Sequence, residues 1–212
     1  MPKKRLNTFE RDILNEVGSM CAGNATTALA QILDRRIDLH FPKIEFVTAE
    51  KLPWYISKHP EEIVIGVHMH ILGGMRGNAL LVFPKKYAFD IIDILIGPFE
   101  NKNDAPTEIG ISALKEMGNV VISAYLSSLT AFTGISAFSS TVNLTSGAAK
   151  YLVNLAFAGL GREDRVETVL IEAIFKEKKR DISGNFFIIF GAQSIRAIIK
   201  KAKNYIKKRG RK

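Results

Sequence analysis

Two runs of polar residues in this chain have the types and spacing of a reactive patch on a helix surface. The runs are Asp12, Glu16 and Ser19, and, one hundred positions later, Ser112, Glu116 and Asn119. Residues at i, i+4 and i+7 share one helix face, so each run presents its side chains together. A carboxylate pairs with a cation, whereas a carboxamide accepts one hydrogen bond and donates another. Either run alone also fits an ordinary solvated helix face.

Each polar run lies in a segment with the apolar periodicity of a long helix. Asn7 and Glu10 have the spacing of a capping box at the start of the first segment. Pro106-Thr107 form a stop-and-cap pair before the second. Gly18 and Gly118 occupy the same place in the two copies, which indicates a close approach by another backbone or by a partner.

The second half of each copy reads as a β-hairpin followed by a helix. Residues 63–70 and 79–83 flank a Gly77-Asn78 turn, and residues 166–175 and 186–190 flank a Gly184-Asn185 turn. Helical patterns follow at 87–96 and 192–206. A segment at 148–160 looks like an additional amphipathic helix, either exposed for a partner or part of the core.

Because each copy is too small to build its own core, we expect the two copies to share one. The predicted class is α+β: a pseudo-two-fold symmetric single domain with an antiparallel sheet flanked by long helices, built from two α-β-β-β-α-like halves. The domain covers residues 1–199, with repeats at about 6–100 and 106–206, and residues 200–212 form a frayed basic tail.

The net charge of +9 is concentrated at the C-terminal end. Residues 176–212 carry 13 Lys and Arg against two Asp and Glu, whereas the first 175 residues carry 17 against 19. A solvated terminus is the expected role of the tail, and contact with an acidic partner, nucleic acid or anionic lipid is the alternative. The first 175 residues are slightly acidic and show no nucleic-acid motif, so nucleic acid is an unexpected partner.

Several other classes of protein are excluded by the sequence. There is no apolar run of transmembrane length and no secretory signal, and Cys21 is the only cysteine, so a reduced, cytoplasmic setting is expected. His68 and His70 alternate on a strand, but two ligands alone make a poor zinc site. We therefore expect no zinc site at these two histidines.

The paired motifs resemble the CheC family of chemotaxis phosphatases, with its relatives CheX and FliY. The pattern is Asp/Ser-x3-Glu-x2-Asn, then 22 residues and a proline, and the stretch 21–29 is similar to a Gly-Ala-Gly-Asn-Ala-Ala-Thr-Ala-Leu signature of the family. The resemblance implies an enzyme that accelerates dephosphorylation of a phosphorylated CheY-type response regulator. It also implies a CheD-type deamidase as a further partner. It implies no metal or cofactor of this chain's own, because Mg²⁺ would be held by the regulator.

Carried onto this sequence, the resemblance makes Glu116 and Asn119 the catalytic pair and Ser112 a partner contact. In the first copy Asp12 is the corresponding contact and Glu16 is present, but Ser19 replaces the asparagine. In the second copy Val142 replaces the proline, which affects only a distant turn. The prediction is one competent site at the second motif and one degenerate site at Glu16 and Ser19.

Hydrolysis of an aspartyl phosphate by water needs mainly positioning and charge stabilisation. The Asn119 amide oxygen can accept a hydrogen bond from the attacking water, whereas the shorter Ser19 hydroxyl holds a water less well. Glu116 would pair with a cationic group beside the phosphorylated aspartate. Because one motif is altered, a binding module for CheY-like or CheD-like proteins with little catalysis is the alternative function.

Overall fold

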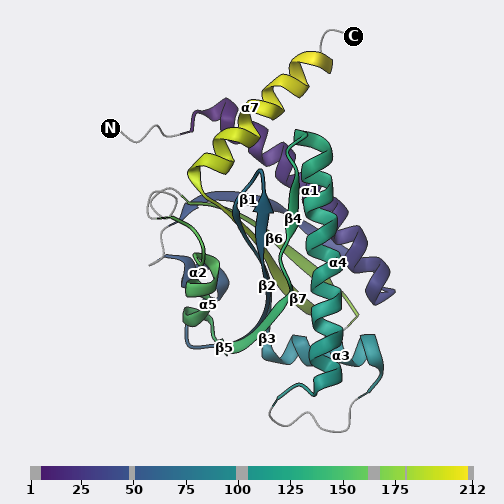
Figure 1. Ribbon diagram of the computed structural model, residues 1–212. Helices are drawn as coiled ribbons and strands as arrows, with labels where there is room; N and C mark the ends of the chain where they lie inside the picture. Colours follow the sequence, from purple (N-terminus) through teal and green to yellow (C-terminus); the bar gives the residue numbers. More distant parts are fainter. Residues whose placement is uncertain (1–5, 48–50, 99–104, 162–167, 180, 210–212) are drawn as a thin grey trace.

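The computed structural model describes residues 6–47, 51–98, 105–161, 168–179 and 181–209 (Figure 1). Within these residues the strands form one seven-stranded sheet in the order β1-β6-β7-β3-β2-β4, with β5 also paired to β2. Every pairing is antiparallel. The strands are β1 Ile37–Val47, β2 Ile63–Gly73, β3 Gly77–Pro84, β4 Ala137–Ser139, β5 Asn143–Ala148, β6 Thr168–Glu177 and β7 Ile182–Phe190.

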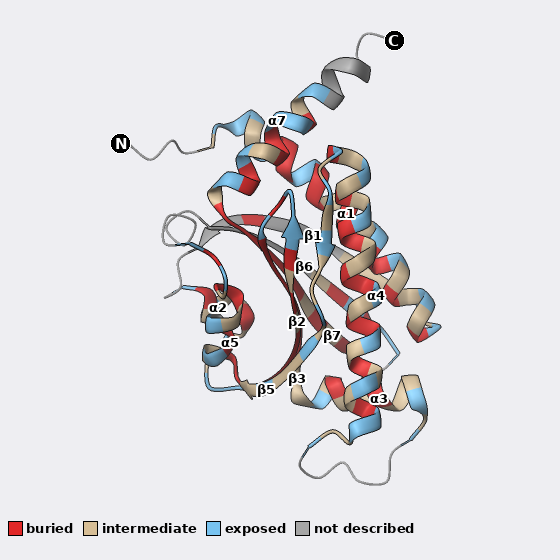
Figure 2. Ribbon diagram, in the orientation of Figure 1, coloured by how far each residue is buried: buried red, intermediate tan, exposed pale blue. Residues whose placement is uncertain are grey.

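Helices cover both faces of the sheet (Figures 1 and 2). One face carries α1 Thr8–Leu33, α3 Lys85–Ile96, α4 Glu108–Thr133 and α7 Ala192–Arg209, and the other carries the short helices α2 Leu52–Ile56 and α5 Ala149–Ala156. Each face has its own apolar cluster. The central strand β3 is therefore buried along almost its whole length, because side chains of both orientations meet a helix layer.

These observations confirm the predicted class, a mixture of helices and antiparallel sheet in a single domain. Strands of one half pair with strands of the other: β1 pairs with β6 of the second hairpin, and β5 pairs with β2 of the first hairpin. The pseudo-two-fold symmetry itself stays a prediction. None of the described helices is long and apolar enough to cross a membrane.

Both long helices begin where the sequence predicts. The Asn7 side chain accepts a hydrogen bond from the Glu10 amide at 2.9 Å, and Glu10 accepts one from the Asn7 amide at 3.3 Å, which completes the capping box. Thr107 caps α4 by accepting from the Gly110 amide. Asp34 and Gly134 end the two helices in the left-handed conformation, with φ of 47° and 67°.

The turns predicted at Gly77-Asn78 and at Gly184-Asn185 are both wrong. Gly77 and Asn78 lie within β3, where they pair with Ile71 and His70. Gly184 and Asn185 lie within β7, where they pair with Phe175 and Ile174. A Cβ at Gly184 would overlap the Phe83 ring, so this glycine makes room for an aromatic side chain of the neighbouring strand β3. The positive φ in the turn between β6 and β7 is supplied by Asp181, at 51°.

The frayed tail predicted from residue 200 does not begin there in the structure, because α7 continues as a helix to Arg209. Ile198, Ile199 and Ala202 are buried against the core. The Lys203 ammonium lies 2.9 Å from Glu10 Oε1 at the start of α1. Apolar packing and this ion pair therefore hold α7 against the core as far as Lys203, although the density of positive charge alone predicts a solvated tail from residue 200.

The additional helix predicted at 148–160 is α5, and it belongs to the core. Its residues Leu152 and Ala156 are buried, as is Phe157 just beyond it. The Asn78 amide donates to the carbonyl oxygens of Ala156 and Ala158 at 2.8 and 3.0 Å, so a buried strand residue fixes the end of the helix.

Candidate functional site

The exposed faces of α1 and α4 carry the two polar motifs. Val17 and Gly18 in α1, and Met117 and Gly118 in α4, are buried, so the opposite face of each helix rests on the interior (Figure 2). A Cβ at Gly118 would overlap the Val67 side chain of β2. Glycine therefore lets α4 lie close to the sheet. The close approach that the sequence predicts at Gly118 is thus made by strand β2.

The second motif forms a compact exposed patch. Ser112 and Glu116 are exposed and Asn119 is half-exposed. Within the part of the chain that the structure describes, no hydrogen bond or ion pair engages the side chains of Glu116 and Asn119. They are thus available to a molecule that approaches α4 from solvent.

The first motif has the same arrangement on α1. Asp12 and Glu16 are exposed and Ser19 is half-exposed. No described residue engages the side chains of Glu16 and Ser19 either. The chemical difference between the two patches is the carboxamide of Asn119, which α1 replaces with a hydroxyl.

The fold keeps the two motifs apart. α1 begins beside α7, whereas α4 begins beside α3 at the other end of the layer (Figure 1). The helices meet near Asn24 and Ser128, whose side chains are 2.8 Å apart. This contact lies about 12 Å along the axis beyond Glu16 and about 18 Å beyond Glu116, on helices that run in opposite senses. The motifs therefore cannot act on one phosphate together.

Exposed apolar residues flank both motifs, which the sequence analysis missed. Phe9 and Met20 on α1 are 56% and 45% exposed, and Ile109 and Val120 on α4 are 64% and 37% exposed. Each pair shares the helix face of its motif within an arc of about 100°. The sequence does contain a signal for these residues, because Ile109 and Val120 follow Phe9 and Met20 by the same hundred positions that separate the two motifs.

We call residues Phe9, Asp12, Glu16, Ser19 and Met20 the first-motif surface. We call residues Ile109, Ser112, Glu116, Asn119 and Val120 the second-motif surface. Polar groups between exposed apolar side chains are typical of a surface that a protein partner covers.

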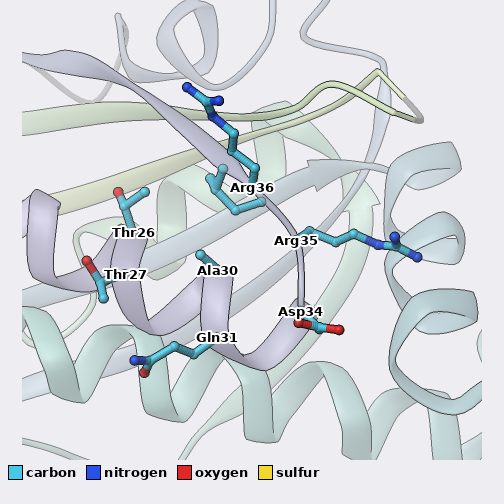
Figure 3. Close-up of a pocket in the computed structure, with 8 residues that line it drawn as sticks. Thr26, Thr27, Ala30, Gln31, Asp34, Arg35 and Arg36 are labelled. Carbon is cyan, nitrogen blue, oxygen red and sulfur yellow. The ribbon is translucent and has the colours of Figure 1, made fainter.

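An open pocket of about 520 Å³ lies at the other end of α1, around Gln31, Asp34 and Arg35 (Figure 3). The Arg35 and Arg36 side chains point in different directions there, and Arg36 lies 3.7 Å from Asp38. The two guanidinium groups do not converge on one ligand. This pocket contains no motif residue.

The crossing of α1 and α4 holds the single cysteine. Cys21 is buried, and burial raises the pKa of its thiol to about 11, a rise that a hydrogen bond with Ser128 partly offsets. A thiol in this state is a poor nucleophile at neutral pH. Cys21 thus acts as a core residue and not as part of the site. No cluster of three metal-ligating side chains occurs among the described residues.

Known proteins of similar sequence point to one family. The sequence model of the CheC-like family matches residues 9–45, which include the first motif. The CheY-P phosphatase CheC of Bacillus subtilis (strain 168) is 24% identical over 183 residues, covering 85% of this chain and 87% of that protein. The flagellar motor switch phosphatase FliY of the same organism is 30% identical over 126 residues, which are 58% of this chain and 32% of FliY.

Solved structures share the fold. FliY of Thermotoga maritima superimposes with a TM-score of 0.69 at 23% identity, covering 96% of this chain and 98% of that one. A CheX–CheY–BeF3–Mg²⁺ complex from Borrelia burgdorferi gives a TM-score of 0.53 at 14% identity, covering 82% of this chain and 96% of that one. Sequence and fold together confirm the resemblance to the CheC-like family that the paired motifs predict.

Proposed function

We propose that this chain accelerates hydrolysis of the aspartyl phosphate of a CheY-type response regulator, using Glu116 and Asn119. The observation that carries the proposal is the exposure of both side chains on one helix face, without a partner among the described residues. The similarity to a protein named CheY-P phosphatase CheC supports the substrate class.

In the proposed reaction, water attacks the phosphorus in line with the acyl oxygen. The bond between phosphorus and that oxygen breaks, releasing inorganic phosphate and the aspartate carboxylate. The Asn119 amide oxygen accepts a hydrogen bond from the water and orients its lone pair, while the amide NH₂ donates elsewhere. Positioning of this kind is the main contribution that a protein can make to phosphoryl transfer.

Glu116 has a docking role in this proposal. A carboxylate beside a phosphoryl group is repelled unless a cation lies between them, so Glu116 pairs with a cationic side chain of the regulator. Ser112, one turn earlier, hydrogen-bonds at the edge of the contact. Mg²⁺ belongs to the regulator, as the presence of this ion in a CheX–CheY complex supports.

The first motif is a degenerate site in the same proposal. Glu16 can still pair with the regulator and Asp12 can contact it, but the single Ser19 hydroxyl does not hold a water as an amide does. A regulator bound at the first-motif surface is therefore retained without efficient hydrolysis. A CheD-type deamidase remains a further proposed partner.

The experiment is the decay of the phosphorylated regulator with wild-type protein, Asn119→Ala and Ser19→Ala. Loss of one preorganised contact costs on the order of 100-fold in rate. We expect Asn119→Ala to abolish most of the acceleration and Ser19→Ala to leave it almost unchanged. Equal losses in both variants would contradict the assignment of one hydrolytic site.

A non-catalytic adaptor is the second candidate function. The observation that favours it is the absence of an amide from one of the two motifs. If wild-type protein binds the activated regulator yet leaves its phosphate lifetime unchanged, the chain is an adaptor for that regulator.

A further inference from the structure

The two motif surfaces have electrostatically different neighbours. The first-motif surface begins beside α7, where the Lys203 ammonium lies 2.9 Å from Glu10 and 5.8 Å from the Phe9 ring centre. α4, which carries the second-motif surface, begins beside α3, where Gly110 faces Ile92. In Figure 1, α7 crosses the start of α1 and lies far from α3.

α7 presents a basic stripe that leads to Phe9. Arg196, Lys200 and Lys203 stand at i, i+4 and i+7, so they lie within about 60° of one another on the helix. Arg196 and Lys200 are exposed. Residues 192–212 contain nine Lys and Arg and no Asp or Glu. The stripe is therefore not neutralised from within its own helix.

α3, the neighbour of the second-motif surface, has no such charge. It carries Lys85 and Lys86 at its start and Asp90 and Asp93 further on, which sum to zero. The two surfaces have similar flanking apolar residues, and the first has one more carboxylate, Asp12 in place of Ser112. The two exposed cations Arg196 and Lys200 of α7 outweigh that carboxylate, so the electrostatic potential around the first-motif surface is the more positive one. A partner with a strong negative charge is attracted more to the first-motif surface.

We infer that the basic stripe of α7 and the first-motif surface together form a capture site for the activated response regulator. The inference rests on the proposed function for the identity of this partner. An aspartyl phosphate carries about −1.5 to −2 charges where the free carboxylate carries one, so the stripe attracts the activated regulator more than the resting one. With Ser19 in place of asparagine, the site holds the regulator close to the protein and leaves hydrolysis to the second motif.

The exposed side of α7 argues for a protein partner over a bilayer. Ile195, Ile198 and Ile199 are buried in the core. Within residues 192–204, the part of α7 whose burial the structure describes, the exposed residues Gln193, Arg196, Lys200, Lys201 and Asn204 are all polar. Amphipathic helices that lie in membranes insert apolar side chains, which the exposed face of residues 192–204 does not offer.

The test isolates the first-motif surface in the complete chain with Glu116→Ala/Asn119→Ala as the background. In this background Arg196→Gln/Lys200→Gln removes two charges of the stripe. Lys58→Gln/Lys179→Gln is the matched control, because both residues are exposed and lie off α7. The affinity for regulator activated with beryllofluoride and Mg²⁺ is measured by calorimetry at about 50 mM and about 300 mM NaCl.

We expect the stripe variant to bind roughly fivefold to tenfold more weakly than the background at low salt, with the difference shrinking at high salt. The control pair should change the affinity by less than about twofold. Equal weakening by both pairs, or by neither, would overturn the inference. Loss of all binding in the background itself would also overturn it, since the first-motif surface would then hold no regulator.

Two further measurements separate the outcomes. If the stripe variant loses binding to anionic vesicles or to a DNA duplex but keeps its affinity for the activated regulator, the stripe serves that other partner and the inference fails. If wild-type protein does not shorten the phosphate lifetime while the stripe variant weakens binding, the proposed phosphatase function fails and the capture site stands.

Discussion

The Lys203 ammonium lies 2.9 Å from Glu10 Oε1, so the last helix is tied to the first turn of the first helix. Glu10 also closes the capping box with Asn7, through its other carboxylate oxygen. One carboxylate therefore stabilises the start of α1 and the position of α7 together. The side chains of Glu10 and Lys203 are only 20% and 33% exposed, which protects the pair from solvent screening better than a fully exposed pair.

A double-mutant cycle of Glu10→Gln and Lys203→Met should therefore give a measurable coupling. We expect each single variant to lower the free energy of unfolding by about 0.5–1 kcal/mol, with coupling of similar size. Urea unfolding at low and high salt measures it, and the coupling should fall with salt. Strictly additive losses would mean that the two side chains do not interact in solution. Lys150 and Glu61, a more exposed pair at 2.8 Å, provide the comparison cycle.

Ser19→Asn should restore the missing amide of the first motif. In an Asn119→Ala background we expect this change to raise the dephosphorylation rate by roughly tenfold, because the water-orienting group returns beside Glu16. The lifetime of the phosphorylated regulator measures the effect. Ser127→Asn, an exposed position on α4 three turns beyond Glu116, is the control that adds an amide outside the motif. A similar gain from Ser127→Asn would show that the location of the amide is irrelevant.

Gly118→Ala should destabilise the protein although alanine favours helix. The gain in helix propensity is about 1 kcal/mol, whereas overlap with Val67 costs about 1–3 kcal/mol. Gly23→Ala is the matched control, since a Cβ there meets nothing within 4 Å and should stabilise α1. Thermal unfolding of both variants gives the signs. Stabilisation by Gly118→Ala would mean that α4 does not lie this close to β2.

The Cys21 thiol should resist alkylation at pH 8 in the native protein. Burial raises its pKa to about 11 from a reference value of 9.0. Because the unfolded thiol loses its proton first, this group's contribution to stability is full below pH 9 and is lost as the pH rises toward 11. Reaction with a thiol reagent, followed with and without denaturant from pH 7 to 10, measures both effects. Rapid labelling of folded protein at pH 8 would contradict the buried, protonated thiol.

Local sequence determined the elements and the site candidates. Asn7 with Glu10 and the Pro106-Thr107 pair predicted both helix starts, because capping depends on residues within one turn. Spacing placed Glu116 and Asn119 on one face of α4, because helical periodicity is fixed by the backbone. The apolar residues Phe9 and Ile109, and Met20 and Val120, are also one hundred positions apart in the sequence. Only their exposure in the structure showed that they belong to the two motif surfaces.

Tertiary structure decided what local signals left open or misplaced. Gly77-Asn78 and Gly184-Asn185 have turn chemistry, yet pairing with neighbouring strands places them in β3 and β7, and Asp181 supplies the positive φ between β6 and β7. Residues 200–209 read as a solvated tail, yet they are helical, with Ala202 buried in the core and Lys203 paired with Glu10. The separation of the two motifs, and the basic stripe beside only one of them, follow from how distant helices pack. Such contacts join residues far apart in the chain, so no local pattern of residue types can encode them by itself.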